Sequence, residues 1–301
     1  PTSREEIVEI VKNCYRRNIP LEINGLKSKN KIGRNFQSEK TLDLSNYKGI
    51  IDYKPEELYI KVKACTPIDV IKEALGKNNQ ELAFEPIDFG FICDGKSNNG
   101  TIGGYLSCNY AGSRRFKVGS VRDHILGFKG VNGKGDIIKS GGTVVKNVTG
   151  YDLSKLITGS FGTLVALTEV TLKVLPKKNL SSTVAIYIEE ANMINDLFDK
   201  LSGSSSEISG AVYIPEEPKN DSFKSNKNNV FKFNDLKPSG SFLAFRVEGD
   251  KISINEKIKN LNVELNLNNF DFITLDSFQS ELFWKKVNSL ELFEKTKNNL
   301  L

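Results

Sequence analysis

The chain has 301 residues, of which 39% are hydrophobic and 26% charged, a balance typical of globular proteins that excludes disordered and collagen-like chains. Its net charge is a mild +5, with lysines and arginines scattered along the chain, so nucleic acid is not expected as a partner. No run approaches the ~18 apolar residues that cross a bilayer, and no basic-then-apolar leader opens the chain. We therefore expect two domains, no transmembrane segment and a cytoplasmic location.

The first 80 residues alternate helical and strand patterns. Ser3 can cap an opening helix, with Glu6 three residues later as a capping box, and apolar residues then recur at helical spacing as far as Cys14. Pro67 and Gly76 have the positions of a helix start and a helix stop. We expect a second helix at residues 67–75 and strands at residues 21–23, 41–44 and 58–64.

Glycine is concentrated in the middle of the chain. Sixteen of the 24 glycines lie between Gly90 and Gly162, where even spacing would place about six. Such a concentration indicates that the backbone approaches something closely. We expect strands at residues 124–131, 136–140 and 165–175, the first two joined by a hairpin turn at residues 132–135.

Glycine becomes rare after Gly162, which places a domain boundary near residue 177. The remainder is predicted to be a second, smaller α/β domain. We expect helices at residues 191–201, 252–261 and 282–292 and strands at residues 183–189, 210–214 and 242–247. A stretch rich in Lys and Asn at residues 219–229 is expected to be a loop.

Two nucleotide-binding patterns occur in the glycine-rich region, and both fail on context. Residues 90–97 fit the P-loop pattern G-x-x-x-x-G-K-[ST], but Pro86 interrupts the segment before them and turn residues follow, where a P-loop needs a strand and a helix. Gly133 and Gly135 begin a dinucleotide fingerprint in which Ile138 replaces the third glycine. We therefore reject a nucleoside triphosphatase and a Rossmann domain.

Three turns rich in small residues lie at residues 24–29, 100–112 and 159–164. Paired glycines beside small and hydroxylated residues leave main-chain amides uncovered, which suits an anion; a tight turn packed against a neighbouring helix is the alternative. The first turn adds two lysines. Two amide-rich loops suit a pyrophosphate, whose two charged groups need donors from both sides, and a third turn suggests one long cofactor across the first domain.

The side chains offer little catalytic chemistry of their own. His124, the single histidine, alternates with apolar residues on a predicted strand, which favours a structural histidine over a proton acceptor. The four cysteines form no C-x-x-C pair, so we expect reduced, partly buried thiols and neither a zinc site nor an iron–sulfur cluster. The chemistry must then be supplied by a cofactor.

Several stretches, dense over residues 20–176, carry a family resemblance. They are Ile23-Asn24-Gly25 through Ser28-Lys29 to Gly33-Arg34, Gly100-Thr101-Ile102-Gly103-Gly104, Ala111-Gly112-Ser113-Arg114-Arg115, Gly119-Ser120-Val121-Arg122-Asp123, and residues 141–176. In them the chain resembles the FAD-binding subunits of glycolate oxidases, within the vanillyl-alcohol-oxidase-like, PCMH-type flavoproteins. The stretch 141–176 is the specific part, since the glycine turns alone would fit many FAD-linked oxidases.

The resemblance implies an α+β fold, with a PCMH-type FAD-binding domain of two subdomains at residues 1–176 and a smaller α/β cap-like domain at residues 177–301. Family members carry a further stretch after the helix of Phe283 and Trp284, so we expect the cap to be incomplete at its C-terminus. Covalent attachment needs a His or Cys in a flavin-facing loop. Because His124 does not match such a position, the resemblance implies non-covalent FAD.

The resemblance also implies which residues contact FAD. One side of the pyrophosphate would meet the turn of Gly25, Leu26, Lys27, Ser28 and Lys29. The other side, approaching the isoalloxazine ring, would meet Gly100, Thr101, Ile102, Gly103, Gly104, Ser107 and Asn109. Gly162 and Val165 would lie near the other end of the flavin, Arg122 and Asp123 would have a structural or flavin-proximal role, and Gly112 completes the expected set.

For function, the resemblance implies a subunit of a complex that oxidises glycolate or another small 2-hydroxy acid, with hydride passing to flavin N5. It implies two partners, a second FAD-binding glycolate oxidase subunit and an iron–sulfur subunit, and peripheral association with the inner membrane through the complex. Because His124 is poorly placed as a base, oxidation on the partner is one reading. The alternatives are a stand-alone FAD-linked dehydrogenase of the D-lactate type and a non-catalytic assembly subunit with the flavin fold.

Overall fold

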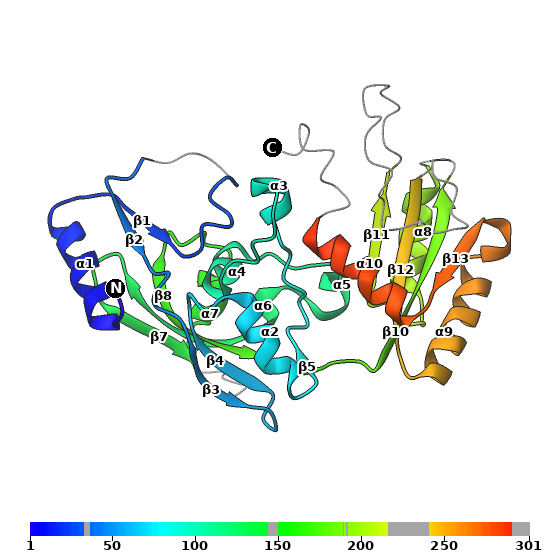
Figure 1. Cartoon of the computed structure of the whole chain (residues 1–301), viewed down its shortest axis with the longest axis horizontal. Coiled ribbons are helices and arrows are strands. Elements are labelled where there is room, and N and C mark those ends of the chain that lie inside the picture. Colours follow the sequence, from blue (N-terminus) through cyan, green and yellow to red (C-terminus); the bar gives the residue numbers. More distant parts are fainter. Residues whose placement is uncertain (33–36, 144–149, 189, 191, 216–240, 291–301) are drawn as a thin grey trace. The chain divides into compact units, whose positions relative to one another are not determined.

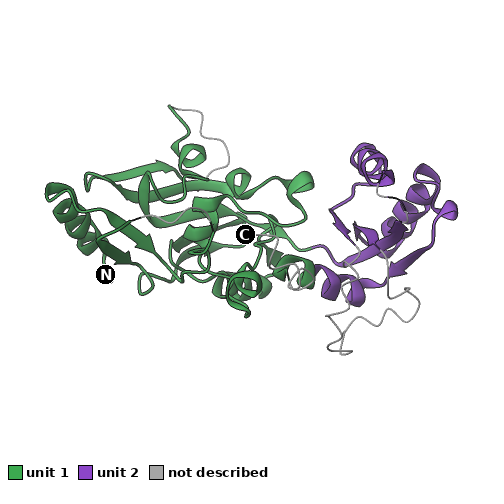
Figure 2. Cartoon of the chain, turned by 90° about the horizontal axis from the view of Figure 1, so that it is seen from above, with its two compact units in different colours: residues 1–177, 285–301 green, residues 178–284 purple. Residues whose placement is uncertain are grey.

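The computed structural model describes residues 1–32, 37–143, 150–188, 190, 192–215 and 241–290 (Figure 1). The chain forms two compact units, coloured separately in Figure 2. Unit 1 is discontinuous and consists of residues 1–177 together with the chain from Lys285 onward. Unit 2 consists of residues 178–284. The expected loop at residues 219–229 and the family-like stretches 33–34 and 146–149 lie outside the described residues.

Unit 1 begins with a helix and a small parallel sheet. The predicted cap of α1 (Arg4–Arg16) is confirmed, because the Ser3 hydroxyl accepts a hydrogen bond from the Glu6 amide at 3.2 Å. β1 (Leu21–Asn24) pairs in parallel with β2 (Lys40–Asp43). Apolar side chains of these three elements form one core cluster with the end of the larger sheet of unit 1.

A five-stranded antiparallel sheet forms the rest of unit 1. Its order is β3 (Ile50–Lys54), β4 (Tyr59–Lys63), β8 (Val165–Lys173), β6 (Ile125–Asn132) and β7 (Ile137–Gly141). Alternate strand residues point to a core that is covered by α2 (Ile68–Gly76), α4 (Ile102–Cys108) and α7 (Leu153–Ile157). A short ladder joins β5 (Gln80–Glu81) to β9 (Leu175–Pro176). The fold is thus mixed α+β.

The glycine-rich middle is more helical than the sequence indicates. Apart from α4 it contains the short helices α3 (Gly90–Asp94), α5 (Arg115–Val118) and α6 (Val121–His124). His124 therefore ends a helix, and the expectation that it alternates along a strand is wrong, since β6 starts one residue later. Strand β3 was not predicted. Its residues Ile50 and Ile51 favour a strand, but both are exposed at the sheet edge, so the strand lacks the apolar alternation of a half-buried one.

Unit 2 is a four-stranded antiparallel sheet with helices. The strand order is β11 (Gly210–Ile214), β12 (Ser241–Gly249), β10 (Leu180–Ile188) and β13 (Phe272–Leu275). One face packs against α8 (Met193–Gly203) and α9 (Lys251–Glu264). The 3-10 helix Leu267–Asn269 precedes β13, and α10 (Ser277–Ser289) follows it. These elements match the expected order, except that the four-residue β13 was not predicted.

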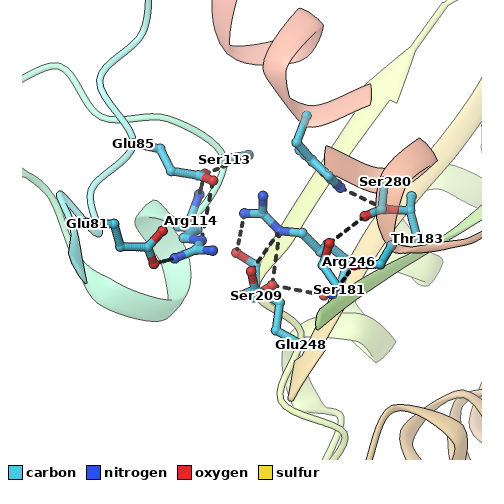
Figure 3. Close-up of polar contacts among 12 residues, drawn as sticks. Glu81, Glu85, Ser113, Arg114, Ser181, Thr183, Ser209, Arg246, Glu248 and Ser280 are labelled. Atoms are coloured by element: carbon cyan, nitrogen blue, oxygen red, sulfur yellow. Dashed lines mark hydrogen bonds and ion pairs between the residues drawn. The ribbon is translucent and has the colours of Figure 1, made fainter. Parts of the chain in front are cut away.

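The other face of this sheet carries a buried polar network (Figure 3). The Arg246 guanidinium lies 4.6 Å from the centre of the Trp284 ring, and its Nε donates to the Ser209 hydroxyl at 3.1 Å. The Trp284 indole N–H donates to Thr183 Oγ1 at 2.8 Å, and Thr183 Oγ1 lies 2.7 Å from the Ser280 hydroxyl. These bonds fix α10 to the sheet, because buried polar groups are costly without partners.

Candidate functional site

The first two predicted turns lie against each other in unit 1. A Cβ atom on Gly100 would lie 2.2 Å from Ser28 Oγ, and one on Gly25 would lie 3.1 Å from Thr101 Oγ1. Gly100 also has a φ of +69°, so both the space and the backbone conformation favour glycine there. The structure therefore brings together the two groups of residues that the sequence analysis assigned to opposite sides of a pyrophosphate.

The turn at residues 24–29 presents main-chain N–H groups that have no acceptor among the described residues. None of the N–H groups of residues 26–29 donates a hydrogen bond to any residue within the described ranges. Lys27 adopts a left-handed φ of 55°, and successive amides around such a residue form a concave anion site. The Asn24 side-chain oxygen accepts a hydrogen bond from the Asn30 side chain at 3.2 Å, which closes the turn.

Lys29 is a largely buried cation at this turn. Its Nζ atom lies 3.9 Å from the centre of the Tyr105 ring and 3.1 Å from Ser28 Oγ. Among the residues that the structure describes, no carboxylate lies within ion-pair distance of Lys29. Burial lowers the pKa of its ammonium group to about 8. Asp88 acts on this ammonium only from beyond ion-pair distance. Within the described ranges, a cation with no carboxylate at ion-pair distance, beside amides that have no acceptor, offers a site for an anionic group. Tyr105 was not predicted, although it directly follows the glycine pair.

The glycines at residues 100–104 serve close packing. Their segment bonds its amides inside the protein: Gly100 to Asn98 Oδ1, Ile102 to the Thr66 carbonyl, Gly103 to the Ala64 carbonyl and Gly104 to Thr101 Oγ1. A Cβ atom on Gly103 would lie 2.8 Å from the Ala64 carbonyl oxygen, so glycine lets α4 touch the end of β4. The sequence analysis left two alternatives for this turn, a site for an anion and a tight turn packed against a neighbouring helix. The four amides bonded inside the protein fit the second.

The predicted residues at the end of α4 lie beside the third turn, at residues 159–164. The Ser107 carbonyl accepts a hydrogen bond from an amide of that turn at 2.8 Å. Asn109 ends α4 with a φ of 54°, and its Oδ1 accepts a hydrogen bond from the Arg122 amide at 3.1 Å, while the Arg122 side chain is exposed. Gly112 has a packing position instead, because a Cβ atom there would lie 2.5 Å from the Glu85 carbonyl oxygen.

Gly162 and Val165 line a cavity of about 430 Å³. Its other walls come from α1, from β1 and from the turn after β6, with Val11, Leu21, Ile23 and Val131 among the apolar lining residues. Strand β1 runs from this cavity to the turn at residues 24–29. Gly162 and Val165 therefore lie at a cavity beside one end of β1, and Lys29 lies in the turn that follows the other end.

The P-loop-like stretch at residues 90–97 is folded around a carboxylate of the chain itself. Asp88 accepts hydrogen bonds from the amides of Gly90 at 2.8 Å and Asn98 at 3.0 Å and from the Ser97 hydroxyl. Because Asp88 takes two of the loop amides, this geometry supports the rejection of a nucleoside triphosphate site. Asn98, whose amide Asp88 holds, also donates from its side chain to the Leu26 carbonyl at 3.3 Å. Asp88 thereby supports the turn at residues 24–29, which we call the anion turn.

His124 is buried in the core beside α6. Its Nε2 atom lies 3.0 Å from the Val118 carbonyl oxygen, and its ring centre lies 5.7 Å from that of Phe84. Burial lowers the pKa of the imidazole, so the ring is neutral at pH 7 and donates its Nε2 hydrogen to Val118. These contacts describe a structural histidine.

The cysteines of the chain are the other side chains to consider as nucleophiles or metal ligands. All four cysteines are free, and burial raises the pKa of the Cys65 thiol to about 12, which makes that thiol unreactive. No group of three His, Cys, Asp or Glu side chains in this part of the chain could hold a metal ion. None of the helices described has both the length and the apolar surface to cross a membrane.

Comparisons with known proteins relate the chain to flavoproteins and to oxidases of hydroxy acids. Residues 1–141 match the protein family described as FAD binding domain. The chain is 39% identical over 189 residues to glycolate oxidase subunit GlcE of Escherichia coli, covering 62% of this chain and 52% of that protein. It is 30% identical over 193 residues to a D-lactate dehydrogenase of Anaerostipes hadrus, covering 64% of this chain and 38% of that protein.

An alkyldihydroxyacetonephosphate synthase has a similar structure, with a TM-score of 0.72 and 18% identity, covering 97% of this chain and 54% of that one. This likeness concerns the fold alone. The chain spans about half or less of the length of the curated relatives it matches. Residues 1–141 thus match an FAD binding domain, and the chain is similar to a glycolate oxidase subunit and to a D-lactate dehydrogenase.

Proposed function

We propose that unit 1 binds FAD non-covalently, with the pyrophosphate at the turn of residues 25–29. The observation that carries this proposal is the pairing of unbonded amides at residues 26–29 with Lys29, a buried cation that has no carboxylate partner in the described part of the chain. Thr101 faces the same turn from the start of α4. The cavity lined by Gly162 and Val165, at the other end of β1, would take one end of the extended cofactor.

Acid precipitation tests the non-covalent mode. His124 is buried, its Nε2 is hydrogen-bonded to the Val118 carbonyl and its ring packs on Phe84, so flavin cannot reach it. We expect the flavin to stay in the supernatant when the loaded chain is precipitated with acid. A yellow pellet would contradict non-covalent binding.

We propose further that the chain is the FAD-binding subunit of a complex that oxidises glycolate or a related 2-hydroxy acid, together with a second FAD-binding subunit and an iron–sulfur subunit. The 39% identity to a glycolate oxidase subunit supports this. Bound FAD supplies an acceptor for a hydride from the α-carbon of the acid. His124 is buried in the core with 3% of its surface exposed, so a substrate cannot reach it as the base for the hydroxyl proton. We therefore assign the oxidation to the partner subunit and an electron relay to this chain.

Anaerobic addition of glycolate to the isolated, flavin-loaded chain tests this division of work. We expect the oxidised flavin spectrum to persist for the chain alone and to bleach once the partner subunits are added. Bleaching of the chain alone would place the oxidation here. Failure to take up FAD would favour a non-catalytic assembly subunit.

The second candidate is a stand-alone FAD-linked dehydrogenase for D-lactate or a similar acid. The identity of 30% to a D-lactate dehydrogenase favours it. It predicts that the purified single chain reduces a redox dye when D-lactate is added, and a chain that is inert toward D-lactate would exclude it.

A further inference from the structure

The five-stranded sheet of unit 1 has a second face, opposite to the one that α2, α4 and α7 cover. Residues paired directly across strands share a face. The register therefore brings one set of lysines together on the second face, from all five strands: Lys54, Lys61, Lys63, Lys129, Lys139 and Lys173. We call this surface the basic face.

The basic face concentrates positive charge. Arg4, at the start of α1, joins the six lysines through an ion pair to Glu169, and the carboxylates in the same register are Asp52 and Glu169. Glu5 also pairs with Arg4, at 3.6 Å, so among the described residues seven cations and three carboxylates leave an excess of +4, close to the net charge of +5 of the whole chain. Charges that are scattered along the sequence are therefore gathered by the fold on one surface.

Glu169 cannot neutralise its neighbours. Its carboxylate lies 3.0 Å from Lys61 Nζ, 3.1 Å from Lys129 Nζ and 3.7 Å from the Arg4 guanidinium, and of these three cations Arg4 also pairs with Glu5, at 3.6 Å. Lys129 also stands directly opposite Lys139 across β6 and β7, a like-charge pair that destabilises a sheet. Folding stability alone gives no reason for this arrangement, whereas attraction to an external anionic surface does.

We propose that the basic face docks an acidic surface of a partner subunit. The inference rests on the proposed function, in which this chain works as one subunit of a complex. Ion pairs hold Lys61 and Lys129 in fixed positions on a rigid sheet, which suits a protein partner whose carboxylates are fixed as well. Ile137 is 51% exposed beside exposed Lys139 and provides apolar contact at the edge of the surface.

A charge-reversal pair tests the docking. The face variant is Lys139→Glu with Lys173→Glu, two residues outside the Glu169 cluster, and the control is Lys251→Glu with Lys259→Glu on exposed positions of α9. Both variants change the net charge equally. We expect the face variant to bind the co-expressed partner subunits about tenfold or more weakly, and the control within about twofold of wild type. FAD content of both variants should match wild type, which confirms folding.

Three other outcomes would overturn the proposal. Equal binding of wild type, face variant and control to the partner subunits would contradict the docking surface and leave the proposed function intact. A wild-type chain that fails to bind the partner subunits would remove the proposed function, and this inference with it. If the face variant instead loses binding only to vesicles containing phosphatidylglycerol, the surface meets a membrane and not a protein.

Discussion

Lys29 combines burial and positive charge with the absence of any carboxylate partner in the described ranges. Burial lowers the pKa of its ammonium from 10.5 to about 8. Below pH 8 both the folded and the unfolded chain hold the proton, and the folded chain bears the cost of burying it. Between pH 8 and 10.5 the unfolded chain binds more protons, so the free energy of unfolding rises with pH. A bound anion would offset this cost by supplying a counter-charge.

Replacement of the Lys29 ammonium should therefore change the stability of the apoprotein and the affinity for FAD in opposite directions. We expect Lys29→Met to stabilise the apoprotein at pH 7 by about 1 kcal/mol and to weaken FAD binding about 10- to 100-fold, through loss of a charge-assisted contact. Chemical unfolding and flavin fluorescence titrations measure the two effects. Lys27→Met, an exposed lysine of the same turn, is the control and should change both quantities much less.

The same group makes FAD affinity depend on pH. As the apoprotein loses the Lys29 proton around pH 8, the dissociation constant for FAD should rise about tenfold between pH 7 and pH 9. The constant of Lys29→Met should stay flat over this range. A flat wild-type profile in fluorescence titrations would show that Lys29 does not act on the cofactor.

Gly103 and Gly104 are adjacent in α4 but differ in their surroundings. A Cβ atom on Gly103 would lie 2.8 Å from the Ala64 carbonyl oxygen, whereas one on Gly104 would have its nearest neighbour at 3.4 Å and Lys29 Nζ at 4.0 Å. We expect Gly103→Ala to lower the free energy of unfolding by about 1–3 kcal/mol, and Gly104→Ala to leave it unchanged or raise it by up to about 1 kcal/mol. If FAD approaches Gly104, that stable variant binds it more weakly; unchanged affinity would place the cofactor elsewhere.

At the scale of elements, the loop at residues 88–98 supports the anion turn without belonging to it. Asp88 holds the amides of Gly90 and Asn98, and Asn98 reaches the Leu26 carbonyl. We expect Asp88→Ala to cost about 2–3 kcal/mol of stability, because it leaves buried donors unpaired, and to weaken FAD binding as well. Asp69→Asn, an exposed acceptor of Asn99, is the matched control and should cost under about 0.5 kcal/mol in thermal unfolding.

The elements that could be predicted from the sequence have a complete local signal. α1 has its cap and its helical spacing, and β4 and β8 have long apolar alternation. α4 has a capping residue, Thr101, but its two adjacent glycines disfavour a helix. The amides of Ile102 and Gly103 are held by the carbonyls of Thr66 and Ala64, just after β4 and about 40 residues earlier in the chain. Short helices of this kind depend on tertiary hydrogen bonds that no local pattern records.

At the scale of the whole molecule, each unit has its own buried core. The clusters of unit 1 and the cluster of unit 2 share no residue, and the single tryptophan, Trp284, lies in unit 2. FAD at about 100 times its dissociation constant should stabilise unit 1 by about 2.7 kcal/mol. We expect the flavin-release midpoint to shift with FAD concentration and the tryptophan fluorescence midpoint to shift less; equal shifts would show that the two cores unfold together.

From the sequence alone, an anionic cofactor and the turns that would meet it could be predicted, because glycine, small hydroxylated residues and lysine act locally on the backbone. The sequence could not tell which amides stay unbonded. The tertiary contacts show that, within the described ranges, the amides of residues 26–29 have no acceptor. Most amides of residues 100–104 are hydrogen-bonded to the carbonyls of Ala64 and Thr66 or to neighbouring side chains. The tertiary structure also decided that scattered lysines form one basic face. Hydrogen-bond partners and surface charge both depend on strand register, which joins residues that are distant in the sequence.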